Sequence, residues 1–175
     1  MYGALFILWG YATFLHSHAQ GVGDKFPLPA VNVKTVDGTP LSTRSIGGKG
    51  KPVLLCFWAT WCKPCIQELI TYEENLKEWA AETGVEIVAV SIDDARNTSK
   101  VGPLVRSKGW PFLVLLDENS DFKRALNVNN VPHTFLLDPN GYVVWQHNSF
   151  KPGDEDEVYE QILIATGKKE KKKRG

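Results

Sequence analysis

Residues 53–65 read VLLCFWATWCKPC, and this stretch decides the fold. Its first part, Val53 to Trp58, is a continuous apolar run, which is typical of a central strand buried on both faces. From Cys62 to Thr83 apolar residues recur at helical spacing, and Gly84 suits the end of a helix. The sequence therefore predicts a buried strand, a short turn and a long helix that begins with two cysteines.

Strands and helices alternate along the rest of the chain. A second apolar run, Val85 to Ile92, predicts another buried strand, and the tetrapeptide DPNG at 138–141 predicts a hairpin turn. The other expected elements are strands at 31–36, 112–116, 135–137 and 142–145, and helices at 99–108, 121–126 and 154–166. This order predicts an α/β domain with a central mixed sheet and helices on both faces.

The composition describes one globular domain. The chain has 175 residues, of which 43% are hydrophobic and 23% charged, and its formal net charge is zero. A chain of this length forms about one domain. With no net charge, no global field draws the protein to nucleic acid, and we expect no nucleic-acid partner.

Both ends of the chain differ in composition from the middle. Residues 2–15 are almost wholly apolar, and the Ser-His-Ala at 17–19 resembles a signal peptidase site. We expect a signal peptide at 1–19, with an uncleaved membrane anchor as the alternative because no Lys or Arg precedes the apolar run. The domain itself is expected at 20–167, followed by a basic, solvated tail at 168–175.

The Cys-x-x-Cys motif at 62–65 has the residues that dithiol exchange requires. At a helix N-terminus, unpaired N–H groups and the helix dipole stabilise a thiolate on Cys62, which we expect to be exposed. Lys63 adds a positive charge beside that thiolate. Cys65, one turn on and more buried, would then resolve a mixed disulfide. Pro64 falls in the first turn, where its missing N–H costs little.

Three other functions of these cysteines remain open. Zinc needs four ligands, or three and a water, and only Cys56, His133 and His147 could join the pair in a processed chain. A metallochaperone could hold Cu(I) through Cys62, Cys65 and His133. A peroxidase would need a peroxidatic cysteine in a Pro-x-x-x-Thr-x-x-Cys context, which the chain lacks before Cys62. We expect redox exchange, with no bound metal and no cofactor.

The segment FWATWCKPC at 57–65 resembles the active site of the thioredoxin superfamily. It is most like the TlpA/ResA-like branch of extracytoplasmic thiol–disulfide oxidoreductases, and the similarity spans 24–166. The resemblance implies a thioredoxin fold with an N-terminal β-hairpin extension at 27–51. It also implies that the protein is periplasmic or otherwise extracytoplasmic, a monomer, and an enzyme that acts on protein thiols or disulfides. A membrane or periplasmic protein would supply its electrons.

The same resemblance assigns roles to residues outside the pair. Val131-Pro132 falls where the family has a cis-proline that faces the dithiol, and we expect it to contact substrate together with Trp61; a trans-proline that ends a loop is the alternative. Glu68 matches an acidic residue typical of ResA-like members. Its position one turn beyond Cys65 would let it exchange protons with the buried thiol, and an exposed helical glutamate is the alternative. His133 replaces a small hydroxyl residue. Cys56 replaces a buried acid and is expected to be a core residue.

Overall fold

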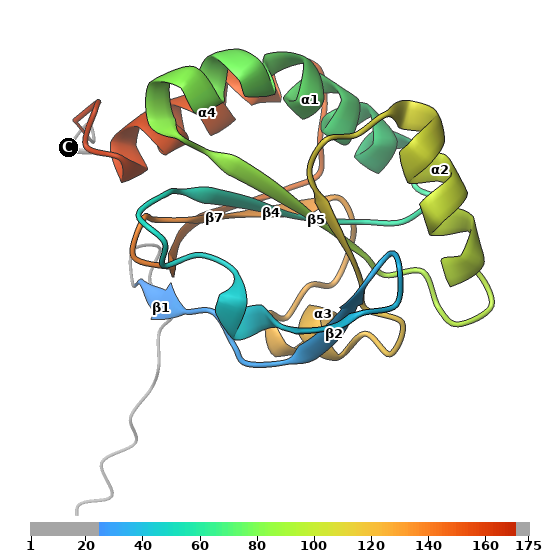
Figure 1. Cartoon of the computed structure of the whole chain (residues 1–175). Helices are drawn as coiled ribbons and strands as arrows, with labels where there is room; N and C mark the ends of the chain where they lie inside the picture. The colour runs from blue at the N-terminus through green and yellow to red at the C-terminus, as the bar shows by residue number, and fades with distance from the viewer. Residues whose placement is uncertain (1–24, 171–175) are drawn as a thin grey trace, which may run out of the picture.

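The computed structural model describes residues 25–170 and arranges its strands in one twisted sheet (Figure 1). The central strands β4, β5 and β6 are parallel, whereas β7 is antiparallel to β4, so the sheet is mixed. In sheet order the strands are β1 (Phe26–Pro27), β8 (Tyr142–Asn148), β7 (His133–Leu137), β4 (Val53–Trp58), β5 (Glu86–Ser91), β6 (Leu113–Leu116), β2 (Asn32–Thr35) and β3 (Pro40–Ser42). The predicted mixed sheet is confirmed.

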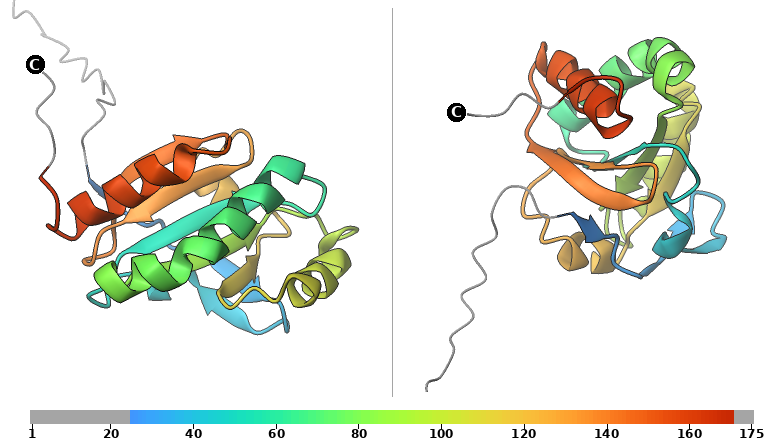
Figure 2. Two further views of the ribbon diagram at one scale, coloured as in Figure 1. Left: turned by 90° about the horizontal axis from the view of Figure 1, so that it is seen from above. Right: turned by 90° about the vertical axis from the view of Figure 1, so that its left-hand side faces the viewer.

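Helices cover both faces of this sheet. The long helix α1 (Lys63–Thr83) and the C-terminal helix α4 (Asp154–Ala165) lie side by side on one face, as the view from above shows (Figure 2). Helix α2 (Val101–Lys108) joins the core of that face. The short helix α3 (Asp121–Ala125) lies on the opposite face (Figure 1). None of the helices within residues 25–170 combines the length and the apolar character that crossing a membrane requires.

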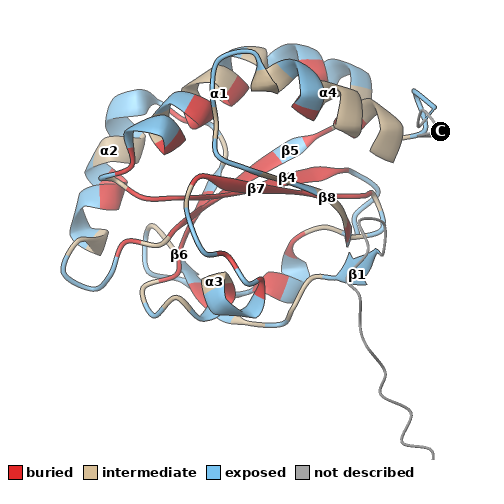
Figure 3. Cartoon of the chain, turned by 180° about the vertical axis from the view of Figure 1, so that it is seen from behind, coloured by how far each residue is buried: buried red, intermediate tan, exposed pale blue. Residues whose placement is uncertain are grey.

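Strand β4 forms the centre of the fold because every one of its residues is buried (Figure 3). Successive side chains of a strand point to opposite faces. Leu54, Cys56 and Trp58 therefore join the core beneath α1, while Val53, Leu55 and Phe57 join the core toward α3. This alternation is what brings Cys56 to the same side of the sheet as the two cysteines of the motif.

The N-terminal segment adds short strands to both edges of the sheet. Strands β2 and β3 form an antiparallel hairpin, and β2 pairs with β6. Strand β1 pairs with β8 at the other edge. The predicted hairpin extension is confirmed, whereas β1, and β3 with the 3-10 turn η1 (Thr43–Ser45), are not among the individual elements that the sequence pattern predicts. Such short edge strands depend on their partners, which no local pattern specifies.

The long helix and the hairpin agree closely with the sequence. Helix α1 begins at Lys63 with Cys62 as its N-cap and ends at Thr83, and its C-cap is Gly84, whose φ of 74° is left-handed. In the hairpin turn Gly141 has a φ of +87°, and a Cβ there would lie 2.9 Å from the amide nitrogen of Gly48. Strand β7 begins two residues earlier than predicted, because His133 pairs with Phe57 of β4. The expected signal peptide and the end of the basic tail lie outside the described residues.

Candidate active site

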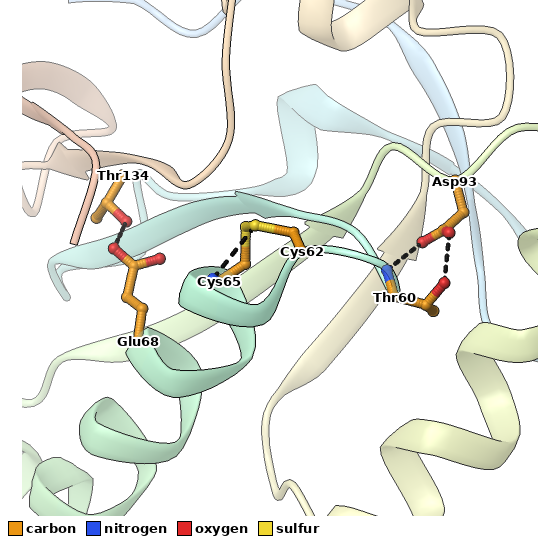
Figure 4. Close-up of a disulfide and its surroundings, with 6 residues drawn as sticks. All are labelled: Thr60, Cys62, Cys65, Glu68, Asp93 and Thr134. Atoms are coloured by element: carbon orange, nitrogen blue, oxygen red, sulfur yellow. Dashed lines mark hydrogen bonds between the residues drawn. A yellow bond between two sulfur atoms is a disulfide. The ribbon is translucent and has the colours of Figure 1, made fainter. Parts of the chain in front are cut away.

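The two cysteines of the motif form a disulfide at the N-terminus of α1 (Figure 4). Their Cα atoms lie 5.3 Å apart, and the Cys62 sulfur accepts a hydrogen bond from the Cys65 amide at 3.3 Å. This places Cys62 where the free N–H groups of the helix converge, the position that stabilises a thiolate once the bond is reduced. The pair can therefore alternate between a disulfide and a reactive dithiol.

The two cysteines differ less in solvent exposure than the sequence predicts. Cys62 retains 5% of its accessible surface and Cys65 none. The prediction that Cys62 is exposed is wrong, because the Cys62 side chain belongs to the core cluster that also contains Trp58 and Cys65. The predicted order of burial is still correct, because Cys62 is the less buried of the two cysteines. Its neighbour Trp61 is 64% exposed, so an apolar surface adjoins the disulfide.

The Val131–Pro132 peptide bond is cis, as the family resemblance implies. It directly precedes β7, whose first residue, His133, lies opposite Phe57 near the end of β4. The bond is thus at the same end of the sheet as the disulfide. Val131 is partly exposed and contacts the core cluster that contains both cysteines, while Pro132 is buried. The alternative of a trans-proline is not what the structure has.

Glu68 is fully buried between α1 and β7, one turn after Cys65. Its Oε1 accepts hydrogen bonds from the Thr134 hydroxyl at 2.9 Å and from the Tyr72 hydroxyl at 3.1 Å. Burial, only partly offset by these two bonds, raises the pKa of the Glu68 carboxyl to about 8. The alternative of an exposed helical glutamate is therefore wrong. A carboxyl with this pKa can take up or release a proton near neutral pH.

Cys56 is a free, fully buried thiol in the same core. Burial, and then the neighbouring Glu68 charge, raise the pKa of the Cys56 thiol well above its ordinary value. A thiol held in its neutral form is a poor nucleophile. The structure thus agrees with Cys56 as a small core residue.

His133 is separated from the dithiol by the sheet itself. Its ring stacks on the ring of Phe135, with the two ring centroids 4.4 Å apart. Phe135 belongs to the core on the α3 side, whereas Cys62 and Cys65 belong to the core on the α1 side. His133 Nε2 instead lies 3.0 Å from the Gln146 side-chain oxygen. Within residues 25–170 no three His, Cys, Asp or Glu side chains gather as metal ligands would.

Asp93 is a site residue that the sequence analysis missed. Its buried carboxylate accepts hydrogen bonds from the Thr60 amide at 2.9 Å and from the Thr60 hydroxyl at 2.6 Å (Figure 4). It also accepts one from the Ser91 hydroxyl at 2.8 Å. These bonds attach the turn that carries Trp61 and Cys62 to the end of β5. The signal was present in the sequence, because Asp93 follows a predicted strand parallel to β4, and parallel neighbours end at one edge of a sheet.

A disulfide at the start of a helix, after a central strand and at the same end of the sheet as a cis-proline, defines a thioredoxin-like redox protein. The comparisons with known proteins agree. Residues 21–163 match the Redoxin family model, and the chain belongs to this family.

Named relatives specify the branch. The chain is 36% identical over 127 residues to the thioredoxin-like protein YneN of Bacillus subtilis, covering 70% of each chain. It is 40% identical over 96 residues to the thiol-disulfide oxidoreductase ResA of the same organism, covering 55% of this chain and 52% of ResA. Among solved structures, an uncharacterized thioredoxin-like protein from Porphyromonas gingivalis is 41% identical with a TM-score of 0.73, covering 82% of this chain and 94% of the other. The protein is a TlpA/ResA-like oxidoreductase of the thioredoxin superfamily.

Proposed function

We propose that this oxidoreductase exchanges disulfides with the thiols of exported proteins, and that Cys62 and Cys65 are its redox-active pair. The observation that carries the proposal is the disulfide at the first turn of α1, beside the exposed Trp61. The relatives named thiol-disulfide oxidoreductase support the reaction class. No observation on the described residues favours the peroxidase or the metallochaperone alternative.

Two exchange steps transfer two electrons from the dithiol to a client. The Cys62 thiolate attacks a client disulfide, so that a mixed disulfide forms and one client sulfur leaves as a thiolate. The Cys65 sulfur then attacks the Cys62 sulfur, which forms the Cys62–Cys65 disulfide and releases the second client sulfur. A client dithiol is oxidised by the same steps in reverse. Cys62 takes the first role because it is the less buried cysteine.

Glu68 supplies a proton acceptor for the second step. Cys65 is fully buried, so its thiol must lose a proton in a place that water does not reach. Glu68 lies one helical turn further on, and its pKa of about 8 means that both protonation states are accessible near neutral pH. In this mechanism Glu68 accepts the Cys65 proton as the sulfur attacks, and returns it in the reverse reaction.

Trp61 and the Val131–Pro132 segment form the client contact in this proposal. Trp61 offers an exposed apolar ring next to the disulfide, and Val131 is a partly exposed backbone position at the same end of the sheet. An extended client segment could pair with the backbone of Val131, because added strands bind through main-chain hydrogen bonds. The client would then present its sulfur close to Cys62.

The proposal places this reaction outside the cytoplasm. It assigns residues 1–19 to a signal peptide or anchor, 20–167 to the redox domain and 168–175 to a basic tail. Its support is the apolar N-terminal run and the Ser-His-Ala that follows. Protein clients and a membrane or periplasmic electron donor are the expected partners, and the domain is expected to act as a monomer. N-terminal sequencing of the exported protein would test the cleavage after Ala19.

Single cysteine variants test the roles of the pair. Cys62→Ser should abolish disulfide reduction in an insulin assay, and Cys65→Ser should accumulate a mixed disulfide with the client. If Cys65→Ser traps nothing while Cys62→Ser does, the two roles are reversed. Equilibration with glutathione gives the reduction potential: a value near −270 mV, about that of thioredoxin, indicates a reductant, and one near −120 mV, about that of DsbA, an oxidant.

A further inference from the structure

The two hydrogen bonds to Glu68 reach the same carboxylate oxygen. Thr134 and Tyr72 both donate to Oε1, at 2.9 and 3.1 Å. The other oxygen, Oε2, is buried and has no hydrogen-bond partner within residues 25–170. Figure 4 shows that the oxygen bonded to Thr134 is turned away from the disulfide, and that the second oxygen is turned toward the side of Cys65. The carboxyl group therefore has two unlike ends.

An oxygen that already accepts two hydrogen bonds is a poor place for a proton. Protonation of Oε1 would force one hydroxyl to turn its donor away inside a buried site, where an unmade hydrogen bond is costly. Protonation of Oε2 disturbs neither bond, and leaves Oε1 as the carbonyl oxygen. The proton of neutral Glu68 consequently belongs on Oε2, the oxygen on the side of Cys65.

We propose that Thr134 is a positioning residue of the redox site, which holds the Glu68 carboxyl so that its proton is carried on the oxygen that faces Cys65. This inference rests on the proton-transfer role of Glu68 proposed above. Thr134 suits the task because β7 fixes it opposite Cys56 of β4, and it has no exposed surface. Tyr72, one turn beyond Glu68 on α1, is the second hydroxyl that donates to the same oxygen of Glu68.

The charged and titratable groups around Glu68 come from three elements, α1, β4 and α4. From α1 they are Tyr72 and, one turn before Glu68, Cys65 when it is reduced; from β4 it is Cys56. From α4 it is Asp154, which raises the pKa of Glu68 slightly and whose own partner, at 3.3 Å, is His147 of β8. Thr134 is the neighbour from β7 and carries no charge. Its hydrogen bond favours the charged carboxylate, and so lowers the pKa of Glu68 against the effect of burial.

Removing the Thr134 hydroxyl tests the inference. Thr134→Val keeps the shape of the side chain, and Thr134→Ser is the control that keeps the donor. Infrared spectra of the oxidised protein follow the carbonyl band of neutral Glu68, which Glu68→Gln removes and so identifies. We expect Thr134→Val to raise the frequency of that band and to raise the pKa of Glu68 by about one pH unit, the size expected for one lost bond to a charged group. Thr134→Ser should match the wild type.

The same variants are then compared in client turnover against pH. Thr134→Val should shift the Glu68-dependent limb of the pH–rate profile to higher pH, by the same interval as the pKa of Glu68. Tyr72→Phe is a second variant in case Thr134→Val folds poorly, and we expect it to shift that limb in the same direction. The inference is overturned if both variants leave the carbonyl frequency of Glu68 and the midpoint of its titration unchanged. If instead Glu68→Gln leaves the pH–rate profile unchanged, the proton-transfer role of Glu68 fails, while the titration of the oxidised protein still decides the role of Thr134.

Discussion

Glu68→Gln should make the oxidised protein more stable at alkaline pH. Glutamine has the shape of the neutral carboxyl, and its side-chain oxygen can accept the bonds from Thr134 and Tyr72 that Glu68 accepts in the wild type. What the substitution removes is the need to ionise a carboxyl inside the core. The folded wild type binds the Glu68 proton more tightly than the unfolded chain does, so its stability must fall as pH rises between the two pKa values.

The magnitude follows from the interval between those values. The pKa of Glu68 is about 8 in the folded protein against an ordinary value of 4.5, a difference of about 3.5 pH units. Each unit corresponds to about 1.4 kcal/mol. The advantage of Glu68→Gln should therefore be near zero at pH 4, grow by about 1.4 kcal/mol per pH unit above pH 4.5, and level off above pH 8 at about 5 kcal/mol. That is comparable with the whole stability of a small domain.

Urea unfolding of the oxidised wild type and variant, measured from pH 4 to pH 9, checks this prediction. The disulfide keeps Cys62 and Cys65 from titrating, and the difference between the two proteins cancels every other group. Glu74→Gln is a matched control, because Glu74 is an exposed carboxylate of the same helix. If the free energies of unfolding of the wild type and Glu68→Gln change in parallel from pH 4 to pH 9, the argument that ionising Glu68 destabilises the folded protein is refuted.

Three further substitutions test other parts of the site. Cys56→Ala should leave client turnover nearly intact and lower the free energy of unfolding by about 1 kcal/mol, for the apolar surface lost; a loss of turnover as severe as in Cys62→Ser would contradict its structural role. Lys63→Glu should raise the pKa of Cys62, measured by alkylation of the reduced protein, and lower the reduction potential by a few tens of millivolts at most. Asp93→Ala should destabilise the protein by about 3 kcal/mol in urea unfolding, because it leaves the Thr60 amide and hydroxyl without their acceptor; an unchanged midpoint would show that this turn is held by other contacts.

The sequence by itself determined the features that depend on neighbouring residues. Val53–Trp58 is a strand with the predicted bounds, because a run of bulky apolar residues is stable only where both faces are buried. Helix α1 follows from its own apolar period and from Gly84 at its end. The redox pair is equally local, because two cysteines three residues apart at a helix start need no distant partner to meet.

Only the tertiary structure decided what surrounds that pair. Thr134 and Glu68 are 66 residues apart in the chain, and their hydrogen bond exists because β7 pairs with β4 beneath α1. The register of that pairing turns Thr134 toward Glu68 and His133 to the opposite face, and a shift of one residue would exchange them. The burial of Glu68, and with it a pKa of about 8, follows from this packing. A local pattern specifies which residues can react, whereas the dielectric and the hydrogen-bond donors that tune them come from segments distant in the sequence.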